Sequence, residues 1–290
     1  MRQLCVIALI AACNSHSSSS ANGGSARATP LSQRDISLQR DANGAYWDAT
    51  EHALYLTEGN ALVRWTDAGN FTEVAQLGSA GVELGGLVRL PDGSFAITSF
   101  GFGSDGGVFV VDPSHQVRAV ANLDPIRRRI GIARAPDGAI YDTYFVVNGH
   151  DHHGGVAALD LGSGGETEMV GSGLAKPVGI AALANELIVS DQDGNAIESI
   201  ARGSNAAVAP IAANLPSVDL LTVLPDGSLV TGGRAGSITE VTRGGTQHPL
   251  AAGFDQVRGT AYDAAGKRLF VVEHGKAKHV LHILSLADST

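Results

Sequence analysis

Short apolar segments alternate with turn residues along most of the chain. The tripeptide Pro-Asp-Gly occurs three times, at residues 91–93, 136–138 and 225–227. Each copy separates two apolar, alternating segments, as in GLVRLPDGSFAIT from Gly86. Alternation with a period of two is typical of β-strands, and Pro-Asp-Gly is typical of a tight turn. These segments therefore predict three β-hairpins.

The same unit recurs in weaker form in the rest of the chain. Related segments begin at Gly44, Gly179 and Gly259, and they place the turn position near residues 49, 91, 136, 184, 225 and 264. Successive turns are thus 39 to 48 residues apart. A repeat of this length, with four short strands in each unit, is the signature of a β-propeller blade. The sequence predicts an all-β fold, a six-bladed β-propeller over residues 31–290.

The two ends of this propeller are expected to pair. The last repeat supplies the strands RLFVV and HVLHIL, while the strand-like residues 34–38 precede the first repeat and have no blade of their own. We predict that residues 34–38 complete the last blade, which would remove exposed sheet edges. If the Pro-Asp-Gly turns lie on one face, the loops between second and third strands and the crossings between blades share the other face. A ligand is expected there, around the central channel.

Composition agrees with a turn-rich, well-packed fold. Glycine accounts for 37 of 290 residues, nearly twice the average share of about 7%. A hydrophobic content of 44% is too high for a disordered chain. The net charge of -9 offers no basic stripe for phosphates, which argues against nucleic acid as a partner.

The N-terminus has the outline of an export signal. Both cysteines lie in MRQLCVIALIAAC, where Arg2 precedes an apolar run too short for a membrane helix. Residues 10–13 resemble the bacterial lipobox, whose cysteine is lipidated and becomes the new N-terminus; ordinary cleavage a few residues later is the alternative. We predict a signal peptide at residues 1–12, a lipid on Cys13, and a flexible tether of Ser, Gly and Ala at residues 13–30.

This anchor predicts where the protein acts. The resemblance to lipoproteins with Asn, here Asn14, after the lipidated cysteine implies export to the outer membrane. The expected location is therefore the cell envelope, with the propeller held on a membrane through the lipid and facing the periplasm or the exterior.

Residues 148–155, NGHDHHGG, form the strongest cluster of chemistry-bearing side chains. They contain His150, Asp151, His152 and His153. Imidazole is the commonest metal ligand, and residues two apart in an extended chain face the same way, so His150 and His152 can approach one ion. Further ligands would come from neighbouring loops, such as Asp191 or His274. Three interpretations stay open: a metal site, a catalytic or ligand-contacting loop, and a solvated loop.

Other polar residues fall in the same predicted loops. His274 beside Glu273 is a candidate general base next to a carboxylate, and a strand end entering a turn is the alternative. Arg128, within a run of three arginines, is a candidate contact for a carboxylate or phosphate, and pairing with nearby acids is the alternative. Arg234 is a further candidate. The predicted catalytic residues are His152 and His274, and the predicted ligand contacts are Asp151, His153, Arg128, Arg234 and Glu273.

The segment LYLTEGNALVRW, residues 54–65, resembles the first blade of the senescence marker protein, gluconolactonase and luciferin-regenerating family. The resemblance extends loosely across all six repeats and places the chain among TolB-like propellers. It implies a six-bladed propeller whose channel binds a divalent cation, usually calcium. In that family the cation polarises a lactone carbonyl or phosphoester for attack by water.

The metal positions of that family are matched only in part. The family's Glu falls on Asn43, which keeps an oxygen ligand but loses the charge. Two Asn positions fall on Val178 and near Ile130, which cannot coordinate a cation, and only Asp219 matches an acidic ligand. Because calcium takes about six to eight oxygen ligands, this set should lose most of the affinity.

Two hypotheses about function follow. In the first, a rearranged site with Asn43, Asp219, His150 and Asp191 holds calcium or zinc and hydrolyses lactones or esters. In the second, the propeller is a non-catalytic module that binds a small molecule or an envelope protein.

Overall fold

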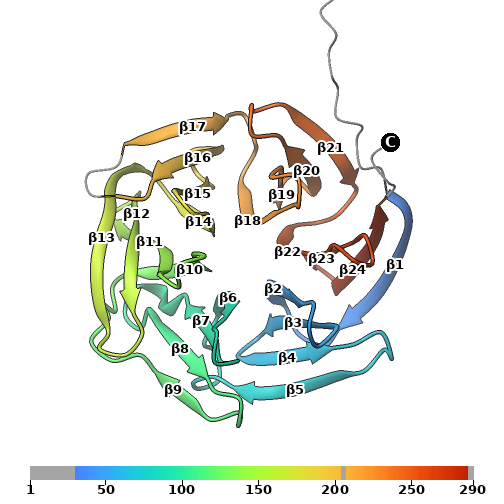
Figure 1. Cartoon of the computed structure of the whole chain (residues 1–290), viewed down its shortest axis with the longest axis horizontal. Coiled ribbons are helices and arrows are strands. Elements are labelled where there is room, and N and C mark those ends of the chain that lie inside the picture. Colours follow the sequence, from blue (N-terminus) through green and yellow to red (C-terminus); the bar gives the residue numbers. More distant parts are fainter. Residues whose placement is uncertain (1–29, 204–206, 287–290) are drawn as a thin grey trace, which may run out of the picture.

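The computed structural model describes residues 30–203 and 207–286, and within these it contains 24 strands and one short 3-10 helix. The strands form six antiparallel sheets of four strands each around a central channel (Figure 1). The predicted all-β, six-bladed propeller is confirmed. In the first five blades the chain runs outward from the channel, so the first strand of each blade is the innermost (Figure 1).

Blade 1 contains β2 (Ala42–Asp48), β3 (Ala53–Glu58), β4 (Ala61–Trp65) and β5 (Phe71–Gln76). Blade 2 contains β6 (Leu84–Arg89), β7 (Phe95–Ser99), η1 (Gly101–Gly103), β8 (Gly107–Val111) and β9 (Val117–Ala119). Blade 3 contains β10 (Arg128–Arg134), β11 (Ile140–Asn148), β12 (Asp151–Asp160) and β13 (Gly165–Leu174). Blade 4 contains β14 (Pro177–Ala182), β15 (Glu186–Asp191), β16 (Ala196–Ala201) and β17 (Val208–Ala212). Blade 5 contains β18 (Val218–Val223), β19 (Leu229–Gly233), β20 (Ser237–Val241) and β21 (Gln247–Ala252).

Blade 6 combines both ends of the propeller. It contains β22 (Val257–Asp263), β23 (Arg268–His274) and β24 (His279–Leu286), and its outermost strand is β1 (Pro30–Leu38). The two outer strands are antiparallel, with Leu38 opposite His279 and Arg34 opposite Ile283. The prediction that residues 34–38 complete the last blade is confirmed.

The Pro-Asp-Gly turns join first and second strands, as expected. Their glycines, Gly93, Gly138 and Gly227, have φ values of 87°, 94° and 86°. This left-handed region is strained for residues with a Cβ, so glycine is favoured there. In each turn the aspartate side chain accepts a hydrogen bond from the backbone N–H two residues later, at 2.9 to 3.2 Å. The conformations and hydrogen bonds of the Pro-Asp-Gly turns thus define the loops on one face of the propeller.

Glycines in the innermost strands have a different role. A Cβ on Gly131 would lie 2.5 Å from the carbonyl oxygen of Val178 in the next blade, and one on Gly259 would lie 2.2 Å from that of Asn43. Real Cβ atoms do not approach backbone so closely. Part of the glycine excess therefore serves the tight ring of inner strands around the channel.

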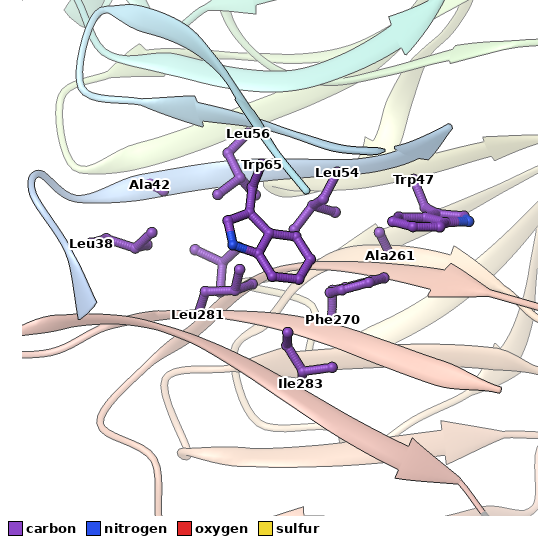
Figure 2. Close-up of a cluster of buried hydrophobic side chains, with 11 residues drawn as sticks. Leu38, Ala42, Trp47, Leu54, Leu56, Trp65, Ala261, Phe270, Leu281 and Ile283 are labelled. Carbon is purple, nitrogen blue, oxygen red and sulfur yellow. The ribbon is translucent and has the colours of Figure 1, made fainter. Parts of the chain in front are cut away.

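The hydrophobic core is divided into clusters, most of which lie between neighbouring blades. Figure 2 shows the cluster that joins the first and last blades, which includes Trp47, Trp65 and Phe270. The ring of Phe270 stacks on Trp47 at 5.1 Å and meets Trp65 edge-on at 5.9 Å between ring centroids. We call this group the closure cluster. Burial of such large rings drives the sheets together and closes the ring.

The predicted signal peptide at residues 1–12, the lipid on Cys13 and most of the tether at residues 13–30 lie outside the described residues. In the part of the chain that the structure describes, no helix has the length and hydrophobicity needed to cross a membrane.

Candidate functional site

A cavity of about 150 Å³ opens around the channel on the face opposite the Pro-Asp-Gly turns. Residues from all six blades line it, most of them at or just before the start of an innermost strand. We call it the channel cavity. Its volume is below the range of about 300 to 1,000 Å³ usual for drug-sized ligands, so it fits a small molecule.

The four positions compared with the family's metal ligands all line this cavity. They are Asn43, Ile130, Val178 and Asp219. Ile130 and Val178 have no ligand atom in the side chain, and the Asn43 amide donates a hydrogen bond to the Leu84 carbonyl at 2.8 Å. Only one carboxylate therefore comes from this set.

That carboxylate already has a cationic partner. Asp219 is 4% exposed, and one of its oxygens lies 3.0 Å from an Arg258 guanidinium nitrogen and 3.3 Å from the Gln192 amide nitrogen. The other oxygen accepts the backbone N–H of Leu220 at 3.0 Å. Burial raises the pKa of the Asp219 carboxyl, and Arg258 opposes that shift. Among the described residues, no three His, Cys, Asp or Glu side chains are grouped to hold a metal ion. These residues do not fit a divalent cation.

The histidine-rich segment lies at the tip of the β11–β12 hairpin. Asn148 pairs with Asp151 and Val147 with His152 across the two strands. His150, Asp151 and His153 are exposed, and none of the three lines the channel cavity.

His152 also lies outside the channel cavity. Its ring meets Phe145 edge-on at 4.8 Å between centroids, and its Nδ1 lies 2.5 Å from a carboxylate oxygen of Asp193. The structure does not bring His152 together with Asp191 or His274.

The carboxylates of Asp191 and Glu273 bind groups of the protein itself and are not directed at a ligand. The Asp191 carboxylate accepts the N–H groups of Ala175 and Lys176, each at 2.7 Å, and so fixes the crossing into blade 4. Glu273 accepts the N–H of Asp255 in the crossing into blade 6, and its second oxygen lies 2.9 Å from Nε2 of His282. Neither residue lines the channel cavity.

His274 does line the channel cavity, on the opposite side of β23 from Glu273. Its Nδ1 lies 3.6 Å from a carboxylate oxygen of Asp41. Partial burial lowers the pKa of His274, Arg258 adds to that shift, and Asp41 opposes it. The imidazole is therefore neutral at pH 7 and able to accept a proton.

The run of three arginines separates into different roles. Arg129 is fully buried and bound to Asp142 and Glu166, and Arg127 binds Glu166 at 2.9 Å. Arg127 and Arg129 are therefore paired with nearby carboxylates, which is the alternative that the sequence left open for this run. The guanidinium of Arg128 instead lies over the Phe100 and Phe145 rings, at 5.4 and 5.8 Å, with no carboxylate partner in the described residues.

Two cations line the channel cavity from blades 4 and 5. Lys176 donates a hydrogen bond to Gln192 at 2.8 Å, and its ammonium lies 5.2 Å from the centre of the Phe145 ring. Burial lowers the pKa of Lys176, the charge of Asp193 opposes that shift, and Arg234 adds to it. Arg234 itself is exposed and has no carboxylate partner in the described part of the chain.

Two carboxylates line it from blades 1 and 2. They are Asp41 and Glu83, and neither has a lysine or arginine partner among the described residues. Glu83 is exposed to water at the opening, yet the surrounding protein and the charge of Asp41 raise its pKa. Glu83 and Lys176 lie in the blade crossings that the sequence predicts on the ligand-binding face, although no role was assigned to them, whereas Asp41 was not predicted there. Each immediately precedes an innermost strand, and this shared position is the signal that points to them.

No family model matches the chain, and no curated protein matches it. Solved structures do. A gluconolactonase from Xanthomonas campestris is 18% identical, with a TM-score of 0.70 over 91% of this chain and 98% of that one. A luciferin-regenerating enzyme is 13% identical, with a TM-score of 0.70 over 88% and 95% of the two chains. A calcium-binding protein, regucalcin, from Agrobacterium tumefaciens is 14% identical, with a TM-score of 0.68 over 86% and 92%. The chain has the propeller fold of these three proteins, in agreement with the family resemblance of its sequence.

Proposed function

We propose that the propeller binds a small molecule in the channel cavity without a divalent metal. The ion pair between Asp219 and Arg258 carries this proposal. A guanidinium at 3.0 Å uses an oxygen that a metal would need, and its positive charge repels a dication. The side chains of Ile130 and Val178 have no atom that can coordinate a metal, so the cavity does not supply the roughly six to eight oxygen ligands that calcium takes. The second sequence hypothesis, a binding module, is therefore favoured over metal-assisted hydrolysis.

A screen of small metabolites tests this proposal. Ligand-induced shifts in the thermal midpoint are measured in EDTA, and again with calcium or zinc, followed by calorimetry on each compound that binds. We expect binding that is unchanged by the chelator and weakened by Arg234→Gln. Stoichiometric metal in the purified protein, with binding lost in EDTA, would overturn the proposal.

Hydrolysis without a metal is a second candidate, favoured by the pair of His274 and Asp41. A neutral imidazole in the cavity can take the proton of a water that attacks a lactone or ester carbonyl. The C–O bond then breaks, and the leaving alkoxide takes the proton back. Turnover of a lactone and ester panel in EDTA tests this candidate. His274→Gln should abolish turnover, whereas His152→Gln, outside the cavity, should retain it; no turnover by the unaltered protein leaves binding alone.

We also propose that a lipid on Cys13 anchors the protein in the cell envelope. The support is the apolar run that ends in Ile-Ala-Ala-Cys, followed by a polar tether. Cys13→Ser should release the protein from washed membranes in a bacterial host. Continued retention of this variant would contradict the anchor.

A further inference from the structure

The unpaired charges of the channel cavity are divided between two opposite sides. Asp41 and Glu83 precede the innermost strands of blades 1 and 2, whereas Lys176 and Arg234 come from blades 4 and 5. In a ring of six blades, blades 1 and 2 lie across the channel from blades 4 and 5. Figure 1 shows this directly, with β2 and β6 below the channel and β14 and β18 above it.

The other charged groups that line the cavity are already neutralised by protein partners. Arg258 is held by Asp219 at 3.0 Å, and the fully buried Arg129 by Asp142 and Glu166. The nearest partner of Asp41 is a neutral imidazole at 3.6 Å. Within the described residues, one side of the cavity therefore has two carboxylates without a direct salt bridge to lysine or arginine, and the other has two cations without a direct salt bridge to a carboxylate.

Apolar side chains also line the cavity, beside polar ones such as Asn43 and Gln192. The apolar residues Leu84, Ile130, Val178 and Leu220 come from four successive innermost strands, and of these Ile130 is the most exposed, being only half-buried. A wholly charged ligand would lose hydration here without compensation, whereas methylene groups gain from contact with these side chains.

We infer that the ligand is a small dipolar molecule with a cationic amine at one end, a carboxylate at the other and an apolar segment between them. The amine faces Asp41 and Glu83, and the carboxylate faces Lys176 and Arg234. This inference rests on the proposed metal-free binding. A ligand with a single charge would leave one side of the cavity without a counter-ion.

The ionisation of the empty cavity is consistent with this arrangement. Burial raises the pKa of Glu83, and the like charge of Asp41 adds to that shift while Arg258 opposes it. Burial lowers the pKa of Lys176, and the like charge of Arg234 adds to that shift while Asp193 and Asp219 oppose it. A bound amine relieves the repulsion between Glu83 and Asp41, and a bound carboxylate relieves that between Lys176 and Arg234.

Calorimetry with matched probes tests the inference. The probe is 6-aminohexanoate, and hexanoate and hexylamine each lack one of its charged ends. Glycine and 4-aminobutyrate vary the distance between the charges. Because each single-ended probe lacks one charge-assisted contact, the best dipolar probe should bind at least about tenfold more tightly than either of them, in EDTA.

Two substitutions assign the ends. Glu83→Gln should weaken 6-aminohexanoate and hexylamine but leave hexanoate unchanged, and Lys176→Gln should weaken 6-aminohexanoate and hexanoate but leave hexylamine unchanged. Glu73→Gln and Lys276→Gln, outside the cavity, are the matched controls and should change none of the three. Thermal midpoints check that each variant is folded. If a variant does not fold, the comparison of the three probes on the unaltered protein tests the inference.

The inference is wrong if hexanoate or hexylamine binds as tightly as the dipolar probes, or if no dipolar probe binds. It is also wrong if both cavity substitutions weaken all probes equally. In each case the metabolite screen in EDTA still decides the proposed function, which fails only if ligand binding needs a metal or no compound binds. The two failures are therefore distinguishable.

Discussion

At the scale of single residues, Arg258 influences the charge state of several ionisable groups in the channel cavity. It is the counter-ion of the buried Asp219 carboxylate and opposes the rise in pKa that burial imposes there. It also adds to the lowering of the pKa of His274 and of Lys176 that burial begins. One guanidinium thus favours the charged form of an acid and the neutral form of two bases, as expected of a cation in a poorly hydrated site.

Replacement of Arg258 with Met should lower the free energy of unfolding by about 2 kcal/mol. This is below the roughly 3 to 5 kcal/mol for breaking a fully buried pair, because the arginine side chain is 25% exposed. The variant raises the folded-state pKa of Asp219 further above its unfolded value, so the folded state binds more protons and the deficit should shrink from about pH 7 to about pH 5. Urea unfolding at both pH values measures this. Arg258→Lys keeps the charge and should lose less; an equal deficit at both pH values contradicts the pairing.

The titration of His274 reports on the same neighbourhood. Asp41→Asn should lower the pKa of His274 further, and Arg258→Met should raise it. Because the folded-state pKa is below the unfolded value of about 6.5, the unfolded state binds more protons at acidic pH, and His274 makes the fold less stable as the pH falls through that range. NMR titration of the imidazole in each variant measures the shifts. Identical His274 titrations in the two variants and the unaltered protein would show that neither charge is coupled to the ring.

At the scale of elements, β1 is fastened to blade 6 by a buried histidine as well as by the strand ladder. His282 on β24 is 4% exposed, and its two ring nitrogens lie 2.8 Å from Asp35 on β1 and 2.9 Å from Glu273 on β23. The ring of Phe254 covers it at 4.8 Å. The sequence shows this histidine only as one polar residue in an apolar strand, so its role depends on strands at opposite ends of the chain.

His282→Ala should lower the free energy of unfolding by about 1 to 3 kcal/mol, because it leaves the buried Glu273 without one of its partners. The loss should appear first at the outer edge of blade 6. Hydrogen exchange should therefore quicken for amides of β1 and β24 and stay unchanged in β20. His153→Ala, on an exposed strand position, is the control and should change stability by less than about 0.5 kcal/mol. Equal effects of both substitutions would contradict the fastening role.

The strands and the face that carries the channel cavity are predictable from the sequence, whereas the pairing of the charged groups within the cavity is not, for a physical reason. Turn and strand signals are local, so three Pro-Asp-Gly hairpins, together with three weaker copies at the same spacing, suffice for six blades. The cavity residues are single positions in different repeats. Whether Glu83 or Lys176 lacks a partner depends on side chains from other blades, which no local pattern contains. Residues 150–153 attract attention because they cluster in the chain, but the β11–β12 register carries them to a hairpin tip.

At the scale of the whole molecule, stability depends on a ring that the chain closes without a covalent link between its ends. The closure cluster joins the first and last blades, and it contains both tryptophans of the chain, Trp47 and Trp65. Intrinsic tryptophan fluorescence therefore reports on this junction alone, while circular dichroism reports on all six blades. The two signals together reveal whether the ring opens at its junction before it unfolds.

Phe270→Ala provides that test, since Phe270 is fully buried between the two tryptophans. Loss of a buried aromatic ring costs about 3 to 5 kcal/mol, and here the cost falls on one junction. In urea, the fluorescence and dichroism transitions should coincide for the unaltered protein. In the variant, the fluorescence transition should come at lower urea, because five junctions keep their packing. Phe102→Ala, at a residue 55% exposed, should leave both transitions in place. If the two signals still coincide in Phe270→Ala, the closed ring unfolds as one cooperative unit and the junction has no separate stability.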